Sequence, residues 1–217
     1  MTESKFHIAL AKQKKEVLKM GKLVKDMLDN SVIAMKNQDL KLAEQVISKQ
    51  NILSKMDEQN EEGLLSLIAL YQPVAKDMRL IACSLKMITY MARIGRYGRD
   101  IAKVTTELHA EPLVAKFVNI PRMERLVTDM VQDALTAYKT EDLTLITNFK
   151  NRDDEVDALR FSIFRECLTY MMENPKFITP CTHYVMVARY LERCGDNACK
   201  MAEKIHYFVT GEHIEIK

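Results

Sequence analysis

The chain has 217 residues and a nearly balanced charge, with 32 Lys and Arg residues against 30 Asp and Glu residues. Six Gly and five Pro residues are too few for a sandwich, a barrel or a many-stranded sheet. The net charge of +2 gives no basic excess for nucleic-acid binding, and no apolar run approaches the roughly 18 residues of a membrane span. We therefore expect long helices, no nucleic-acid partner, no direct membrane insertion and a cytoplasmic location.

Six long helices are predicted, because apolar side chains recur at helical spacing through most of the chain. In the first helix they repeat every seven residues, as in a coiled coil, with Val17 and Val24 in one row and Met20 and Met27 in the other. Gly211 is placed to end the last helix. The predicted helices cover residues 6–36, 40–70, 74–108, 123–138, 143–173 and 181–209.

A break at residues 109–121 divides these helices into two units, 1–110 and 120–217. The third and sixth helices align at an offset of 100, and the matched positions include Tyr90/Tyr190, Arg93/Arg193, Gly95/Gly195 and Ala102/Ala202. A glycine inside a helix costs about 1 kcal/mol relative to alanine. Its recurrence at one register indicates a close backbone approach or space for something bound. The sequence therefore predicts an all-α fold of two tandem three-helix bundles, related by a pseudo-twofold repeat.

Two acidic pairs in the second unit are the candidate metal ligands. Asp153 and Asp157 lie four residues apart in the fifth helix, and Glu192 and Asp196 lie four residues apart in the sixth. Carboxylates at this spacing share one helix face about 5–6 Å apart and repel each other. On neighbouring helices, four such groups would favour a hard cation with oxygen ligands. An ordinary solvated acidic face is the alternative, and both interpretations remain open.

The first unit does not repeat these acids. Matching helix two to helix five and helix three to helix six gives Gln50, Ser54, Ala92 and Arg96 at the four positions. The third helix instead carries a basic face that would suit an anion or an acidic partner, made of Arg93, Arg96, Arg99 and Lys103. Salt bridges within the helix, such as Arg96 with Asp100, are the alternative interpretation.

Signatures of catalysis are missing from the sequence, and we do not expect an enzyme. There is no Gly-rich phosphate loop, no Cys/His zinc pattern and no Ser/His/Asp ordering. Glu203 and His206 form one Glu-x-x-His motif, whereas ferritin-like di-iron sites use two, so a chance surface pair is the simpler interpretation. The five cysteines include no Cys-x-x-Cys and are expected to be buried free thiols.

The sixth helix resembles the PhoU family of phosphate-uptake regulators. The resemblance lies in Leu191-Glu-Arg-Cys-Gly-Asp196 and in the closing Thr210-Gly-Glu212, and it is supported by Arg152-Asp-Asp-Glu-Val-Asp157 and by Gln72-Pro73. It implies a non-enzymatic, cytoplasmic and often dimeric regulator. Such proteins act as helical adaptors that restrain phosphate uptake or starvation signalling. The implied partners are the ATPase subunit of the phosphate-specific ABC transporter, a membrane sensor histidine kinase and a second copy of the chain.

The resemblance also implies a metal site in the second unit. Iron or zinc is the implied metal, with Mg, Mn or Ca left open, and the implied ligands are Asp153, Asp157, Glu192 and Asp196. The first unit is expected to lack such a site. The alternative function, from another class, is a carboxylate-bridged protein that stores metal or performs redox chemistry.

Overall fold

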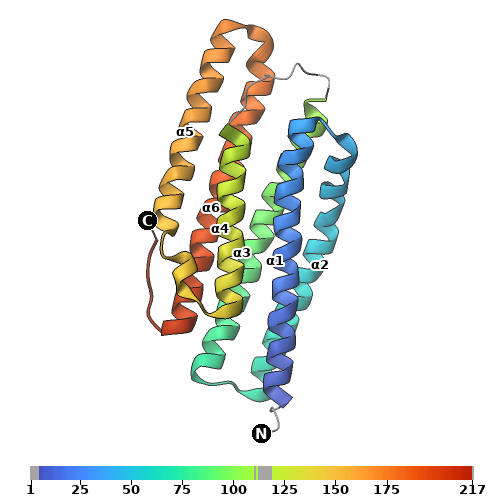
Figure 1. The fold of residues 1–217 in the computed structure, drawn as a ribbon. Helices are drawn as coiled ribbons and strands as arrows, with labels where there is room; N and C mark the ends of the chain where they lie inside the picture. Colours follow the sequence, from blue (N-terminus) through green and yellow to red (C-terminus); the bar gives the residue numbers. More distant parts are fainter. Residues whose placement is uncertain (1–4, 110, 112–118, 217) are drawn as a thin grey trace.

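The computed structural model describes residues 5–109, 111 and 119–216, and these residues form six α-helices and no strand (Figure 1). The helices are α1 (Lys5–Asn37), α2 (Leu40–Tyr71), α3 (Ala75–Glu107), α4 (Asn119–Thr140), α5 (Phe149–Glu173) and α6 (Ile178–Thr210). The predicted all-α fold of two tandem three-helix bundles is confirmed. Most of the predicted break, at residues 110 and 112–118, lies outside the described residues.

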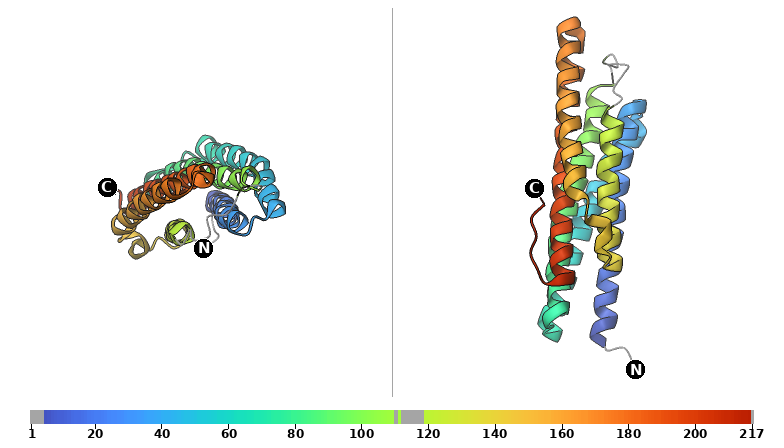
Figure 2. Two further views of the ribbon diagram at one scale, coloured as in Figure 1. Left: turned by 90° about the horizontal axis from the view of Figure 1, so that it is seen from above. Right: turned by 60° about the vertical axis from the view of Figure 1, so that its left-hand side comes forward.

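The six helices form two layers (Figure 2). One layer has the order α2, α3, α6, α5, and the second layer consists of α1 and α4, which cover one face of the first. The first bundle is α1–α3 and the second is α4–α6, and they meet where α3 packs on α6 and α1 packs on α4. We keep residues 1–110 and 120–217 as the proposed limits of the two repeats. The other face of the four-helix layer, named here the outer face, is not covered by another helix.

The coiled-coil pattern of the first helix correctly identifies its buried side. Val17, Met20, Val24 and Met27 have no exposed surface, and they belong to one hydrophobic core that spans both bundles. Ser31 lies in the same row and is also buried, where its hydroxyl donates a 2.7 Å hydrogen bond to the Leu28 carbonyl oxygen. All five cysteines are free and buried, as predicted.

Two helices begin earlier than predicted because proline is tolerated in the first turn. α4 begins at Asn119 with Pro121 two residues later, and α6 begins at Ile178 with Pro180 two residues later. The first four N–H groups of a helix have no partner within it, so a missing N–H costs little there. The last helix ends as predicted, since Gly211 adopts a φ of +84° and its N–H donates to the Tyr207 carbonyl oxygen at 2.8 Å.

The fifth helix begins later than predicted. Residues 143–146 form a separate 3-10 turn, and α5 starts at Phe149. The Asp142 carboxylate caps the start of this turn, because it accepts hydrogen bonds from the Thr144 backbone N–H at 3.0 Å and from the Thr144 hydroxyl at 2.6 Å. The helix is then interrupted at residues 147 and 148. Among the described residues, no helix is both long enough and apolar enough to cross a membrane.

Candidate functional site

The repeated glycines sit where each bundle brings two helices close together. A Cβ atom on Gly95 would lie 2.3 Å from Cδ2 of Leu53 in α2, and one on Gly195 would lie 3.4 Å from Oδ1 of Asp153 in α5. Leu53 and Asp153 differ by 100 in number, as the two glycines do. The two glycines therefore leave room for side chains of the neighbouring helix rather than for its backbone, and the same offset relates α2 to α5.

This contact corrects the predicted match between the two bundles. Asp153 was paired with Gln50 and Asp157 with Ser54, but the glycine contacts place Leu53 at the position of Asp153, three residues further on. The positions in the first bundle that correspond to the four acids are therefore Leu53, Asp57, Ala92 and Arg96. Sequence periodicity did not reveal this register, because α2 carries no glycine that marks it.

Three of the four predicted acids in the second bundle form one electrostatic cluster, made of Asp153, Asp157 and Asp196. Burial, together with repulsion from Asp196 and Asp157, raises the pKa of Asp153 to about 6, although the Cys199 thiol donates a hydrogen bond to it. Burial also raises the pKa of Asp196, with Asp157 adding repulsion and Arg193 opposing the rise. The predicted repulsion between the two helices is thus present.

The fourth predicted acid, Glu192, does not join this cluster. It is buried, and its carboxylate pairs with Arg189 on the preceding turn of α6. Its other oxygen lies 3.4 Å from Nε of Arg160 in α5. Two guanidinium groups therefore balance its charge. Sequence spacing did not show this pairing, because Arg160 comes from a neighbouring helix.

The acidic cluster has the type of ligand that a hard cation prefers, but its side chains are not arranged around a common point. Carboxylate oxygens are the ligands of hard divalent cations, and Gly195 leaves room for the Asp153 carboxylate against α6. Within residues 5–109, 111 and 119–216, however, no three His, Cys, Asp or Glu side chains are arranged to hold a metal ion. A metal site at Asp153, Asp157 and Asp196 therefore stays a prediction, and the Glu192 carboxylate is already paired with two arginines.

The equivalent place in the first bundle carries a cation of its own. Asp57, Glu61 and Arg96 line a hollow of about 410 Å³ between α2 and α3. Burial and repulsion from Glu61 raise the pKa of Asp57, and the Arg96 guanidinium opposes that rise. An arginine therefore stands beside Asp57, where the second bundle places Asp196 beside Asp157.

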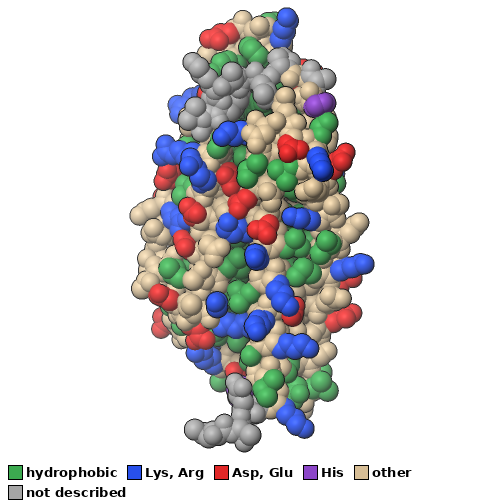
Figure 3. All heavy atoms as spheres, turned by 45° about the vertical axis from the view of Figure 1, so that its right-hand side comes forward, with side chains coloured by type: hydrophobic (Ala, Val, Ile, Leu, Met, Phe, Trp, Pro, Cys, Tyr) green, Lys and Arg blue, Asp and Glu red, His purple; other side chains and the backbone are tan. Residues whose placement is uncertain are grey.

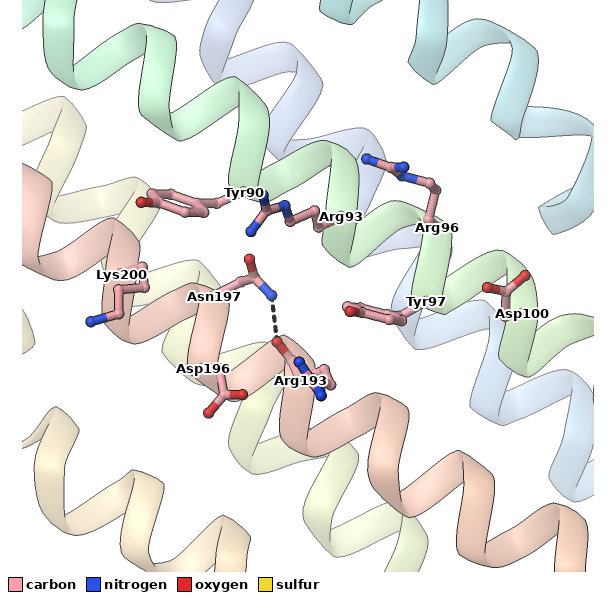
Figure 4. Close-up of a pocket in the computed structure, with 9 residues that line it drawn as sticks. All are labelled: Tyr90, Arg93, Arg96, Tyr97, Asp100, Arg193, Asp196, Asn197 and Lys200. Atoms are coloured by element: carbon pink, nitrogen blue, oxygen red, sulfur yellow. Dashed lines mark hydrogen bonds between the residues drawn. The ribbon is translucent and has the colours of Figure 1, made fainter. Parts of the chain in front are cut away.

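The predicted basic face divides into two parts. Arg93 and Arg96 line a pocket of about 540 Å³ between α3 and α6 (Figure 4). Arg99 donates to the Asp100 carboxylate at 2.7 and 2.9 Å, and the Lys103 ammonium lies 3.9 Å from the same carboxylate. Salt bridges within the helix are therefore present, as the alternative interpretation expected, but they join Asp100 to Arg99 and Lys103 rather than to Arg96.

The sequence did not predict that α6 forms one wall of this pocket. Its α6 wall consists of Arg193, Asp196, Asn197 and Lys200, and its α3 wall includes Arg93, Arg96, Tyr97 and Asp100. These residues form four pairs at the offset of 100, so the repeat already contained the signal. The surface shown in Figure 3 has basic and acidic side chains interspersed, without a large area of one sign.

The fold and its two charge clusters define a class, an all-helical tandem-repeat protein whose bundles carry different charges at equivalent positions. A family model described as the PhoU domain matches the chain twice, over residues 17–105 and 120–205. The chain belongs to the PhoU family.

Relatives with nearly the full length of this chain support the assignment. The phosphate-specific transport system accessory protein PhoU homolog of Caulobacter vibrioides is 38% identical over 202 residues, which cover 92% of this chain and 87% of the relative. The homolog of the same name from Clostridium acetobutylicum is 33% identical over 217 residues, covering 100% and 99%. The crystal structure of PhoU from Pseudomonas aeruginosa has a TM-score of 0.91 and 31% identity, covering 96% of this chain and 100% of that one.

Proposed function

We propose that the protein is a non-enzymatic regulator of phosphate uptake and phosphate homeostasis. The observation that carries this proposal is the double match to the PhoU domain, since both helical repeats are present and matched. Relatives that align over nearly the whole chain are named accessory proteins of the phosphate-specific transport system. The sequence also lacks the catalytic motifs that an enzyme of this size would carry.

The proposed mechanism is that of a helical adaptor in the cytoplasm. The outer face presents α3 and α6 to a partner, and the proposed partner is the ATPase subunit of the phosphate-specific ABC transporter. A membrane sensor histidine kinase is the second proposed partner, and a homodimer is the proposed assembly. Binding would restrain uptake or starvation signalling when phosphate is plentiful.

The first test is capture of the transporter ATPase by the full chain, with and without phosphate. We expect retention of the ATPase that increases with phosphate, because a negative regulator acts when phosphate is plentiful. An ATPase subunit from an unrelated ABC transporter serves as the control. Equal retention of both ATPases, or none of either, would contradict the adaptor proposal.

A metal ion in the second bundle is a separate part of the proposal, with iron or zinc first and Mg, Mn or Ca left open. Asp153, Asp157 and Asp196 would hold the ion, and Glu192 is excluded from the set by its two arginines. The ion would supply positive charge that offsets carboxylate repulsion between α5 and α6. Its proposed role is to hold these two helices together.

The Asp196→Asn variant tests this part by effects of opposite sign. Without added metal, we expect a higher melting temperature than in the unsubstituted protein, because one of three repelling charges is removed from a partly buried cluster. With added metal, the unsubstituted protein should gain stability, since a ligand that binds only the folded state stabilises it. Asp196→Asn should gain less. Thermal melts with metal and with chelator measure both effects.

The control for this test is Glu173→Gln, which changes an exposed acid at the end of α5, outside the cluster. It should melt like the unsubstituted protein under both conditions. If metal and chelator leave every melting curve unchanged, the cluster is an ordinary solvated acidic face.

The alternative function in metal storage or redox chemistry has weaker support. Its motif requires Glu203 as a ligand, yet this side chain is buried rather than on the surface as first interpreted. Its Oε1 atom lies 2.8 Å from the Lys200 ammonium and accepts a 3.1 Å hydrogen bond from the Ile216 N–H. Glu203 therefore fastens the C-terminal segment to α6, and we prefer the adaptor proposal.

A further inference from the structure

The pocket between α3 and α6 lies at the centre of the outer face. In Figure 4 the two helices lie in front of α1 and α4, and the labelled side chains stand on the near side of both helices. Because α3 and α6 run in opposite directions, Tyr90 of α3 lies at the same end of the pocket as Lys200 of α6, and Asp100 lies at the other end. Its volume of about 540 Å³ falls within the usual range of small-molecule sites.

Positive charge dominates the pocket. Four cationic side chains line it, namely Arg93, Arg96, Arg193 and Lys200, against the carboxylates of Asp100 and Asp196. Asp100 is already bound by Arg99 at 2.7 Å. Asp196 acts on both Arg193 and Lys200, and Lys200 is further paired with Glu203 at 2.8 Å. The four cations therefore outnumber the two carboxylates, although Asp196 offsets part of the charge of Arg193.

Arg93 and Arg193 are the one cationic pair of the pocket that is identical in both repeats. Among the described residues, neither has a carboxylate oxygen within the 4 Å of a salt bridge. The guanidinium carbon of Arg93 instead lies 6.0 Å from the centre of the Tyr90 ring. Both guanidinium groups line the same pocket, so an anion bound there would offset their charges.

Neutral side chains, held by their own contacts, surround Arg93 and Arg193. The Asn197 side-chain N–H donates a 2.6 Å hydrogen bond to the Arg193 carbonyl oxygen, which holds its carboxamide between the two helices (Figure 4). The Tyr97 ring stacks on Tyr190 with ring centres 5.8 Å apart, so the aromatic wall also joins the two repeats. The pocket therefore offers guanidinium donors within a framework of tyrosine and asparagine.

We propose that this pocket binds a phosphate-type oxyanion, held between Arg93 and Arg193 across the pseudo-twofold axis. Guanidinium groups donate two parallel hydrogen bonds to phosphate oxygens, and they retain their charge at every physiological pH. The anion is free orthophosphate or the phosphate group of a larger molecule, for which the volume leaves room. The site stands on its own geometry, and only its physiological meaning rests on the proposed function. A small anion is favoured over an acidic protein segment because the two arginines line one pocket of about 540 Å³, which suits a small molecule.

The test is a calorimetric titration of the full chain in chelator, so that phosphate bound through a metal is not counted. The probes are orthophosphate, pyrophosphate, a nucleoside triphosphate and an acidic peptide. We expect saturable binding of one phosphate compound per chain at millimolar concentrations or below. Arg93→Gln and Arg193→Gln should each weaken binding about tenfold or more, because a hydrogen bond to a charged group is lost.

Arg165→Gln is the matched control, since it removes one exposed positive charge from α5 outside the pocket. It should leave the affinity within about twofold, and circular dichroism should show that all variants remain helical. Binding of orthophosphate alone identifies the free anion, and preference for the larger compounds identifies a phosphate group carried on them. The proposal is overturned by three results: no saturable binding, equal weakening by Arg165→Gln, or binding of the acidic peptide only. None of these results depends on the capture of the transporter ATPase.

Discussion

Replacing Phe208 with alanine should lower the free energy of unfolding by about 3–5 kcal/mol. The Phe208 ring has no exposed surface, and it lies near the end of α6 against the first bundle. The ammonium groups of Lys14 in α1 and Lys76 in α3 lie 5.9 and 5.8 Å from its centre. The Arg79 Nε–H also donates to the Phe208 carbonyl oxygen at 3.3 Å. Removing the ring leaves a cavity at a junction of the two repeats.

Urea denaturation followed by circular dichroism measures this loss. Phe208→Leu retains most of the apolar volume, so it should cost less than Phe208→Ala and leave mainly the loss of the two cation–π contacts. Phe164→Ala makes the same change at an α5 residue that is 43% exposed, and it should cost about 1 kcal/mol or less. Equal losses in Phe208→Ala and Phe164→Ala would show that the α6 end does not hold the two bundles together.

The contact between α1 and α4 should make the protein less stable as the pH rises from about 4.5 to 7. Burial and a hydrogen bond with Asp29 raise the pKa of Glu124 from 4.5 to about 7. Asp29 accepts a 2.8 Å hydrogen bond from Lys25, while its Oδ1 atom is buried and has no such partner among the described residues. A proton on Glu124 therefore supplies the donor that two facing carboxylates lack.

The sign of the effect follows from the raised folded-state pKa. The folded protein holds a proton on Glu124 that the unfolded chain releases near pH 4.5, so this stabilisation is full below pH 4.5 and is lost as the pH rises through about 7. The full shift corresponds to about 3 kcal/mol. Because the carboxyl group is partly exposed, solvent screening reduces the expected loss to about 2 kcal/mol.

Glu124→Gln should remove this part of the pH dependence, because the amide donates to Asp29 at every pH. The variant should be more stable than the unsubstituted protein at pH 8 and similar to it at pH 5. Asp129→Asn, at an exposed acid of the same helix, serves as the control and should keep the slope. Chemical denaturation at several pH values measures these differences. Parallel curves for Glu124→Gln and the unsubstituted protein would show that the shared proton is absent.

Helical periodicity was enough to predict the six helices, because long amphipathic segments and an end signal such as Gly211 act locally. The 3-10 turn at residues 143–146 was not predicted, because residues 143–173 contain no Gly or Pro that marks the interruption at residues 147 and 148. Contacts between helices were harder to predict from the sequence. The pairing of Glu192 with Arg160 and the contact of Leu53 with Gly95 depend on how the helices pack, which spacing along one helix does not contain.

The candidate site was therefore predicted only in part. Asp153, Asp157 and Asp196 are brought together as the i, i+4 spacing indicated, whereas Glu192 is held apart by its arginines. Arg93 and Arg96 were recognised as a basic face from α3 alone. The α6 wall of the pocket was not predicted, because an alignment of the two repeats does not show which residues of α3 and α6 line the same pocket.

The exchange of charge between equivalent positions gives the outer face a direction. A duplicated fold would by itself show a docking protein the same surface twice, related by half a turn, and the docking protein would fit equally well either way round. Here Arg96 and Asp196 occupy equivalent positions but carry opposite charges, and the same is true of Asp100 and Lys200. If the docking protein were rotated by half a turn, its charged groups would meet groups of the same sign, and this repulsion costs free energy. The fold thus combines a repeated backbone with an asymmetric charge pattern, which would favour a single orientation of the proposed partner.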